Sequence, residues 1–280
     1  MQPRALKRLM QLAEPQRLDA IAEGLGLLAE HVATLRQDVI HLAEGDRPRG
    51  RAVLAAQSEE EAAKALILLD LVRMDWRDHK AVSRQIGRFY NHLARCIYVD
   101  AVQMRPADFR EVRERVDWLR RSHYLDGPND VDWIFRNQLI AEREDSLYVD
   151  YVHEEEGDRW TTPASKEGVD FGVVDTGVQD LVGSLHRTGC TSRAGLEVVA
   201  AAWTGQPIDD DTHWQEVRAV NRSIIKKLAE EGHTPTDATA DDARRVIERW
   251  HFPLAGIDLK EIEVPLAQLE ANRARYVDLG

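Results

Sequence analysis

The stretch 18-LDAIAEGLGLLAEHVATLRQDVIHL-42 decides the fold class of this chain. Its apolar residues recur every three or four positions, which is the spacing of one face of a long α-helix. They are Leu18, Ile21, Leu25, Leu28, Val32, Leu35, Val39 and Leu42. Gly24 and Gly26 weaken this helix, so it must be held by packing against neighbouring helices or a partner chain. The sequence therefore predicts a helical bundle.

Three more amphipathic helices are predicted to complete the bundle. A turn-like segment at 45–50 precedes a helix over 51–74, and a third helix runs over about 79–102. Arg105 and Pro106 end the third helix, because proline does not continue a helix. Apolar residues then return at helical spacing and indicate a fourth helix, with Phe109, Val112, Val116 and Leu119.

The second half of the chain is predicted to be a separate helical region. The alternating aromatic and β-branched residues of 147-LYVDYV-152 are typical of a short strand. The charged segment 153–168 has no periodicity, so we predict a boundary there, between domains at 1–165 and 166–280. Helices are then expected over 174–187, 192–203, 211–231, 239–250 and 259–276. The expected fold is all-α, an N-terminal antiparallel helical bundle with a short β element, followed by a smaller C-terminal helical region.

The composition excludes several classes of protein. The chain has 280 residues, of which 43% are hydrophobic and 31% charged, a balance typical of a folded globular protein. No apolar run approaches the ~20 residues that a membrane span needs. The N-terminus does not resemble a secretory signal, so we expect a cytoplasmic protein without membrane contact.

The motifs of metal and cofactor sites are also absent from the sequence. Cys96 and Cys190 are far apart and have no CxxC partner, so they predict neither a disulfide framework nor a zinc site. The GxGxxG and GxxxxGK[ST] motifs of nucleotide-binding proteins are missing, and so is the HExxH motif of metal centres. We therefore expect no cofactor and no metal.

Positive charge is concentrated in one part of an acidic chain. The 37 Lys and Arg residues are outnumbered by 49 Asp and Glu residues, which gives a net charge of −12. Between Arg73 and Arg121, however, 12 basic residues outnumber 7 acidic ones. Such a local excess attracts phosphate groups, whereas the acidic remainder opposes indiscriminate binding to nucleic acid.

The predicted third helix carries a cationic face when it is drawn at ~100° per residue. This face consists of Lys80, Arg84, Arg88, Asn91, His92 and Arg95. Arg84, Arg88 and His92 follow one another at i, i+4 steps, so the arginines could bracket a phosphate while the histidine transfers a proton. These groups suffice for metal-free RNA cleavage. The alternative is a solvated basic stripe, or one neutralised by acidic residues of the preceding helix.

A second candidate pair, Arg73 and His79, lies at the junction of the second and third helices. Five residues separate them, so both are expected beside a helix–helix turn and facing one cleft. One interpretation is a phosphate clamp with an acid/base group; the other is a capping histidine and a surface arginine.

Several short segments resemble the AbiV-type abortive infection proteins of bacteria, within the HEPN superfamily. The matching words are 58-SEEEAAKALILLDLVR-73, HK at 79–80, 89-FYNHLARCIY-98 and 147-LYVDYV-152 with Trp160 and Pro163. Glu60, Glu61 and Lys64 match the EE..K pattern of that group, where we expect them to be structural polar residues. The resemblance covers about residues 15–165.

The resemblance implies an activity. HEPN domains are helical bundles that commonly dimerise, and many are metal-independent endoribonucleases whose signature is an arginine, four to six residues, and a histidine. Arg73 and His79 fit this spacing, whereas Arg88 and His92 are one residue too close. The candidate catalytic residues are therefore Arg73, His79, Arg88 and His92, and the candidate RNA-binding residues are Lys80, Arg84, Asn91 and Arg95.

The implied protein is a phage-defence toxin that damages RNA, acts as a homodimer and responds to a phage-encoded protein. An alternative is an inactive HEPN-like module that senses a phage protein or holds a partner. A further alternative is a purely structural oligomer joined through the stripe from Leu18 to Leu42.

Overall fold

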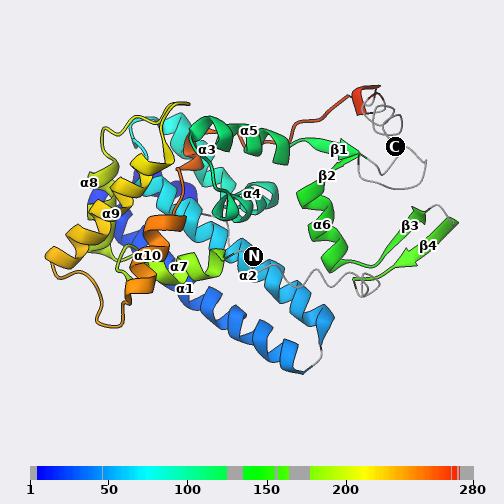
Figure 1. Cartoon of the computed structure of the whole chain (residues 1–280), viewed down its shortest axis with the longest axis horizontal. Coiled ribbons are helices and arrows are strands. Elements are labelled where there is room, and N and C mark those ends of the chain that lie inside the picture. Colours follow the sequence, from blue (N-terminus) through cyan, green and yellow to red (C-terminus); the bar gives the residue numbers. More distant parts are fainter. Residues whose placement is uncertain are drawn as a thin grey trace.

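Helices dominate the computed structural model of the chain (Figure 1). The structure describes residues 5–45, 47–124, 135–154, 157–163, 177–265, 267–269 and 271. Within these ranges the strands form two separate two-stranded antiparallel sheets, β1 with β2 and β3 with β4. The predicted all-α class is confirmed.

A long antiparallel hairpin of α1 (Glu14–Glu44) and α2 (Pro48–Val72) forms the frame of the molecule (Figure 1). The stripe predicted for α1 faces the core through Leu18, Ile21, Leu25, Val32 and Leu35, all buried. The C-terminal half of α2 is buried on every side, as expected for a helix at the centre of a bundle. A 3-10 helix, η1 (Leu6–Gln11), precedes α1.

The third predicted helix is in fact two helices, α3 (His79–Arg88) and α4 (His92–Gln103). The prediction of one continuous helix over 79–102 is therefore wrong. Asn91 has an extended backbone, and its side chain accepts a hydrogen bond from the Ala94 amide at 2.9 Å. Asparagine is a strong N-cap because its short polar side chain satisfies an amide that has no helical partner. Side chains before and after this break do not share one face.

The segment after α5 (Phe109–Leu119) contains the strands. β1 (Ser122–Tyr124) pairs with β2 (Phe135–Asn137), and α6 (Gln138–Leu147) follows.

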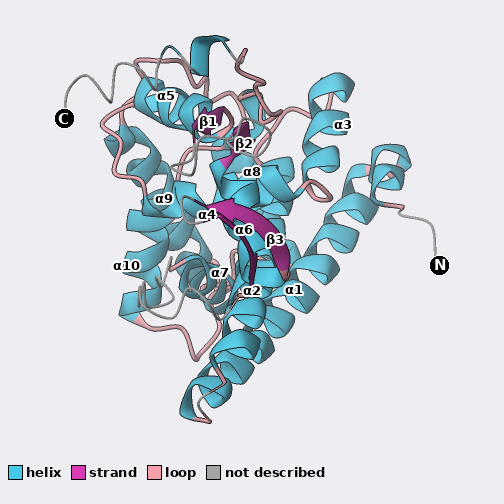
Figure 2. Cartoon of the chain, turned by 90° about the vertical axis from the view of Figure 1, so that its right-hand side faces the viewer, coloured by secondary structure: helices cyan, strands magenta, loops and turns pink. Residues whose placement is uncertain are grey.

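A projecting hairpin follows α6. The strand expected at 147–152 begins three residues later, as β3 (Asp150–Glu154), because Leu147 still belongs to α6. β3 pairs with β4 (Gly157–Thr161), with Tyr151 opposite Trp160. This hairpin extends away from the helices in Figure 1 and lies in front of α4 and α6 in Figure 2.

The C-terminal helices pack at the other end of the molecule (Figure 1). They are α7 (Val178–Arg187), α8 (Arg193–Trp203), α9 (Trp214–Glu230) and α10 (Ala240–Arg249), followed by the 3-10 helix η2 (Leu254–Gly256). The fifth helix expected there is absent over 259–265. Residues 267–269 and 271 are helical, and the rest of 266–276 lies outside the described residues. Residues from both expected domains share one hydrophobic core. The predicted boundary near residue 165 also lies outside the described ranges.

Two buried arginines tie the segment 251–257 to the N-terminal bundle. Arg73 donates to the Asp70 carboxylate at 3.1 Å and to the His251 carbonyl at 2.8 Å. Arg88 donates to the carbonyls of Leu254, at 2.9 Å, and Ile257. Asp70 accepts from the Leu254 amide at 2.8 Å, so carboxylate, guanidinium and backbone groups satisfy one another away from water.

Lowering the pH is expected to destabilise the protein through His251. This side chain is buried, and its ring stacks on Trp214 with the ring centroids 4.7 Å apart. Burial lowers the pKa of His251 to about 4, and the nearby charges of Arg249 and Arg73 act in the same direction. In the unfolded chain its pKa returns to about 6.5, so the unfolded state binds the proton first. The free energy of unfolding should therefore fall between pH ~6.5 and ~4, by on the order of 3 kcal/mol from this group.

Urea unfolding of the wild type and of His251→Gln at pH 7 and pH 4.5 measures this contribution. The variant should lose less stability between the two pH values than the wild type. His79→Gln, at an exposed histidine, should lose as much as the wild type. Equal losses in the wild type and His251→Gln would rule out the role of His251.

Candidate acid–base site

Three side chains converge on the carboxylate of Glu60, a buried residue of α2. His92, the first residue of α4, places Nδ1 at 2.8 Å from Oε2. Arg95 Nη1 lies 3.0 Å from the same oxygen, and Arg143 Nε of α6 lies 2.5 Å from Oε1. We call these four residues the Glu60 cluster; it joins α2, α4 and α6.

The surrounding cations keep Glu60 ionised although it is buried. Burial alone raises the pKa of this carboxyl group, but the hydrogen bond from Arg143 and the charges of Arg95 and His92 act in the other direction and prevail, so its pKa is lowered. A carboxylate with hydrogen bonds to both oxygens has a fixed orientation. Glu60 is therefore an anionic support for the groups around it.

His92 is the member of the cluster that reaches solvent. Its side chain is 50% exposed, whereas that of Glu60 is 7% exposed. Arg95 Nη2 also lies 3.0 Å from Nδ1. Glu60 can only accept a hydrogen bond and Arg95 can only donate one, so the two compete for Nδ1. We assign a proton to Nδ1 and a hydrogen bond from it to Glu60, in which case Arg95 binds the carboxylate and Nε2 of the neutral ring keeps its lone pair. The ring can then exchange a proton at Nε2.

Glu61 and Lys64 form a separate ion pair next to the cluster. Lys64 Nζ contacts Glu61 Oε1, which also accepts from Gln57 Nε2 at 2.9 Å. Lys64 does not pair with Glu60, four positions before it, because the Glu60 carboxylate is bound by residues of α4 and α6. Lys64 Nζ instead lies 5.5 Å from the centroid of the Phe89 ring. Glu61 is buried.

The structure does not bring Arg73 and His79 into one cleft. The Arg73 side chain is 1% exposed and lies between the rings of Trp203 and Trp250, at 4.1 and 4.7 Å from their centroids. His79 is exposed at the first position of α3. Arg73 therefore holds the core together and is not accessible to a phosphate in this structure.

Arg88 and His92 are also apart from each other. Arg88 is buried, and its guanidinium binds Gln85 and the 254–257 backbone, whereas His92 faces Glu60. The expected ridge of Arg84, Arg88 and His92 is wrong, because the helix ends between Arg88 and His92. Of the residues predicted to bind RNA, Asn91 caps α4 and Arg95 is buried in the Glu60 cluster.

Lys80 and Arg84 remain on the exposed face of α3, as the helical spacing predicted. η1 packs beside α3 and adds exposed Lys7 and Arg8. None of these four side chains forms an ion pair with another described residue. We call them the cationic α3 surface.

Sequence reasoning missed Arg143. It follows Glu60 by 83 positions, and the charged run 142-EREDS-146 has no pattern that separates this arginine from a surface residue. Cys96, next to Arg95 in the chain, does not add a nucleophile, because burial raises the pKa of its thiol to about 12.

Two further features of the described residues concern metal ions and membranes. In the ranges that the structure describes, no three His, Cys, Asp or Glu side chains gather as metal ligands would. Among the same residues, no helix is long and apolar enough to cross a membrane.

Comparison with known proteins identifies one family. The family model HEPN_AbiV, described as AbiV, matches residues 20–171, more than half of the chain. The match includes every residue of the Glu60 cluster and the whole of α2 to α6. No curated protein and no solved structure matches the chain.

Proposed function

Because the chain belongs to the AbiV family of HEPN proteins, we propose that it is an anti-phage abortive infection protein that cleaves RNA at the Glu60 cluster without a metal ion. Family membership indicates the abortive infection role. The endoribonuclease activity is our inference from the residues of the cluster.

One observation carries this proposal: His92 is half-exposed and is oriented through Nδ1 by a buried carboxylate. A catalytic base needs a ring nitrogen that is accessible to substrate and a second group that fixes the ring. Glu60 is the group that fixes the His92 ring, and Arg95 and Arg143 carry positive charge beside it.

The proposed reaction is attack of a ribose 2′-oxygen on the adjacent phosphorus. His92 Nε2 takes the 2′-hydroxyl proton, the new P–O bond forms and the bond to the 5′-oxygen breaks. The 5′-oxygen leaves with a proton from water, and His92 returns its proton to solvent. The products are a 2′,3′-cyclic phosphate and a 5′-hydroxyl, and no oxidant or cofactor is needed. The positive charges of Arg143 and Arg95, which stay bound to Glu60, stabilise from a distance the negative charge that grows on the phosphoryl oxygens.

The charges around His92 favour a phosphodiester. Glu60 carries one negative charge, and Arg95 and Arg143, which bind it, carry two positive ones. His92 also begins α4, and the N-terminus of a helix attracts anions. The cationic α3 surface supplies further phosphate contacts for a longer strand.

The experiment is to incubate the purified chain with RNA in the presence of EDTA and to analyse the ends of the products. We expect cleavage that leaves 2′,3′-cyclic phosphate and 5′-hydroxyl ends. An RNA with a single 2′-deoxy nucleotide at the cleaved position should be resistant there, because it lacks the attacking hydroxyl. Cleavage that stops when EDTA is added, or that proceeds at the 2′-deoxy position, would reject this mechanism.

A non-enzymatic module is the second candidate function. Both arginines of the predicted Arg–His pairs, Arg73 and Arg88, are committed to the core, and the β3–β4 hairpin exposes Tyr151 and Trp160. Exposed aromatic pairs suit protein recognition. Intact RNA after incubation with an excess of folded protein would favour this function.

The proposed partner is RNA in the first case and a phage protein in the second. A homodimer, a phage-encoded trigger and a cytoplasmic location stay predictions, and sedimentation of the purified chain measures the first of these directly.

A further inference from the structure

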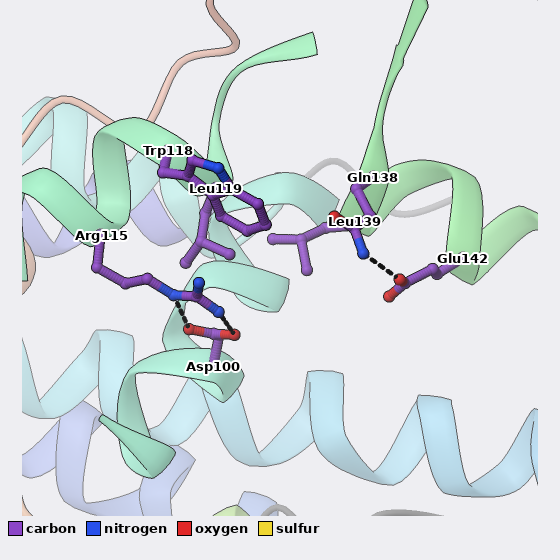
Figure 3. A pocket seen from close by; sticks show the side chains of 7 residues that line it. All are labelled: Asp100, Arg115, Trp118, Leu119, Gln138, Leu139 and Glu142. Carbon is purple, nitrogen blue, oxygen red and sulfur yellow. Dashed lines mark hydrogen bonds and ion pairs between the residues drawn. The ribbon is translucent and has the colours of Figure 1, made fainter. Parts of the chain in front are cut away.

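A pocket of about 110 Å³ lies between α4, α5 and α6 (Figure 3). Its apolar wall consists of Trp118 and Leu119 from α5 and Leu139 from α6. The Trp118 side chain is large and flat, and the residue is 43% exposed. Pockets for drug-sized ligands occupy ~300–1,000 Å³, so this one accommodates a single ring system.

The polar side of the pocket combines a cation with two groups that accept hydrogen bonds. Arg115 donates Nε and Nη2 to the Asp100 carboxylate at 3.2 and 3.0 Å, which leaves Nη1 unused by any described residue. Gln138 Nε2 donates to Glu142 at 2.7 Å, so the amide carbonyl of Gln138 is not occupied by that bond. Figure 3 shows these groups around the apolar wall.

The pocket and the Glu60 cluster are built on the same two helices. α4 carries His92 at its start and Asp100 eight residues later, about 12 Å along the helix axis. α6 carries Glu142 on the pocket and Arg143 in the cluster. A short single strand held at His92 can therefore extend to the pocket.

We propose that this pocket binds a nucleobase of the RNA whose backbone is held at the Glu60 cluster. The proposal rests on the function proposed above. Bases of single strands are typically bound by stacking on exposed aromatic side chains and by hydrogen bonds at their edges. Arg115 lies over the Trp118 ring, with 4.7 Å between the guanidinium carbon and the centroid, and the residue is still 43% exposed, so a base can stack against this ring and the guanidinium.

The polar groups determine which bases fit. Glu142 and the Gln138 carbonyl accept hydrogen bonds, so they favour bases with an exocyclic amino group, namely adenine, guanine and cytosine. Arg115 Nη1 donates and suits a ring nitrogen or carbonyl oxygen. Uracil and thymine have no amino group, and their one edge N–H lies between two carbonyl oxygens that the Glu142 carboxylate repels, so they are expected to bind less tightly.

Binding of non-cleavable oligonucleotides tests this site separately from catalysis. Fluorescence anisotropy with labelled tetranucleotides of 2′-deoxyadenosine or thymidine gives a Kd for the wild type, Trp118→Ala, Trp118→Phe and Glu142→Ala. Trp118→Ala should raise the Kd for the adenosine tetranucleotide about tenfold, because stacking on one side chain is lost. Trp118→Phe should raise it much less. Glu142→Ala should reduce the preference for adenosine over thymidine.

Trp160→Ala is the matched control, since Trp160 is a 69% exposed tryptophan on the β3–β4 hairpin and does not line the pocket. Its Kd should equal that of the wild type, and circular dichroism should show all variants folded. An unchanged Kd in Trp118→Ala, or an equal rise in Trp160→Ala, would overturn the base site even if the wild type cleaves RNA. Trp118-dependent binding by a protein that leaves RNA intact would keep the base site and reject the nuclease.

Discussion

His92→Ala is expected to lower the rate of RNA cleavage by about 10²- to 10⁴-fold, the usual contribution of a general acid–base group. The variant loses the only ring that Glu60 orients towards solvent among the described residues. Because the side chain is half-exposed at a helix start, its removal leaves no buried cavity. The rate is measured under single-turnover conditions with the RNA identified in the EDTA experiment.

His79→Ala is the control that separates the two candidate histidines. His79 is exposed on α3, and Arg73, the partner expected for it, is buried against Trp203 and Trp250. We expect this variant to cleave at the wild-type rate. The same comparison is made in cells, from growth and total RNA with and without phage. His79→Ala should behave as the wild type does, and His92→Ala should lose the effect on both. Loss of cleavage in His79→Ala with full activity in His92→Ala would transfer the active site to the α2–α3 turn.

Asp70→Asn is expected to lower the free energy of unfolding by about 3–5 kcal/mol, the cost of removing one member of a buried ion pair. Arg73 is 1% exposed and keeps its charge at neutral pH, although burial lowers its pKa to about 10. Asparagine retains the shape of Asp70 but leaves this cation uncompensated beside the rings of Trp203 and Trp250. Urea unfolding at pH 7 measures the change.

Two further variants make the result specific. Asp75→Asn removes the partner of exposed Arg77 and should leave the stability unchanged, because water solvates that pair. Asp70→Asn combined with Arg73→Met should recover part of the loss, since the buried charge is gone. A loss of similar size in Asp75→Asn, or no recovery in the double variant, would show that burial of the Arg73 charge is not the cause.

The cationic residues in the first half of the chain have two different roles. Arg73 and Arg88 hold the segment 251–257 against the bundle, so their charge is used for stability. Arg95 and Arg143 lie around Glu60 next to a histidine that reaches solvent, and in the proposed reaction their charge acts there.

Local periodicity in the sequence was enough to determine the fold class. Of the predicted α1 stripe, Leu18, Ile21, Leu25, Val32 and Leu35 are buried, because one face of an amphipathic helix meets the core, whereas Leu28, Val39 and Leu42 are half-buried. Lys80 and Arg84 also lie on the predicted exposed face. Such features depend on neighbours within one or two turns, which the sequence contains directly.

The site depended on tertiary structure, for two physical reasons. Asn91 stops one helix and starts another, and this single cap removed the face on which Arg88 and His92 were expected to meet. Glu60 and Arg143 are 83 positions apart, so only packing of α6 against α2 and α4 brings them together. Whether an arginine enters the core or stays at a site depends on the partners that the fold places beside it, and helical periodicity contains no information on partners so distant in the chain.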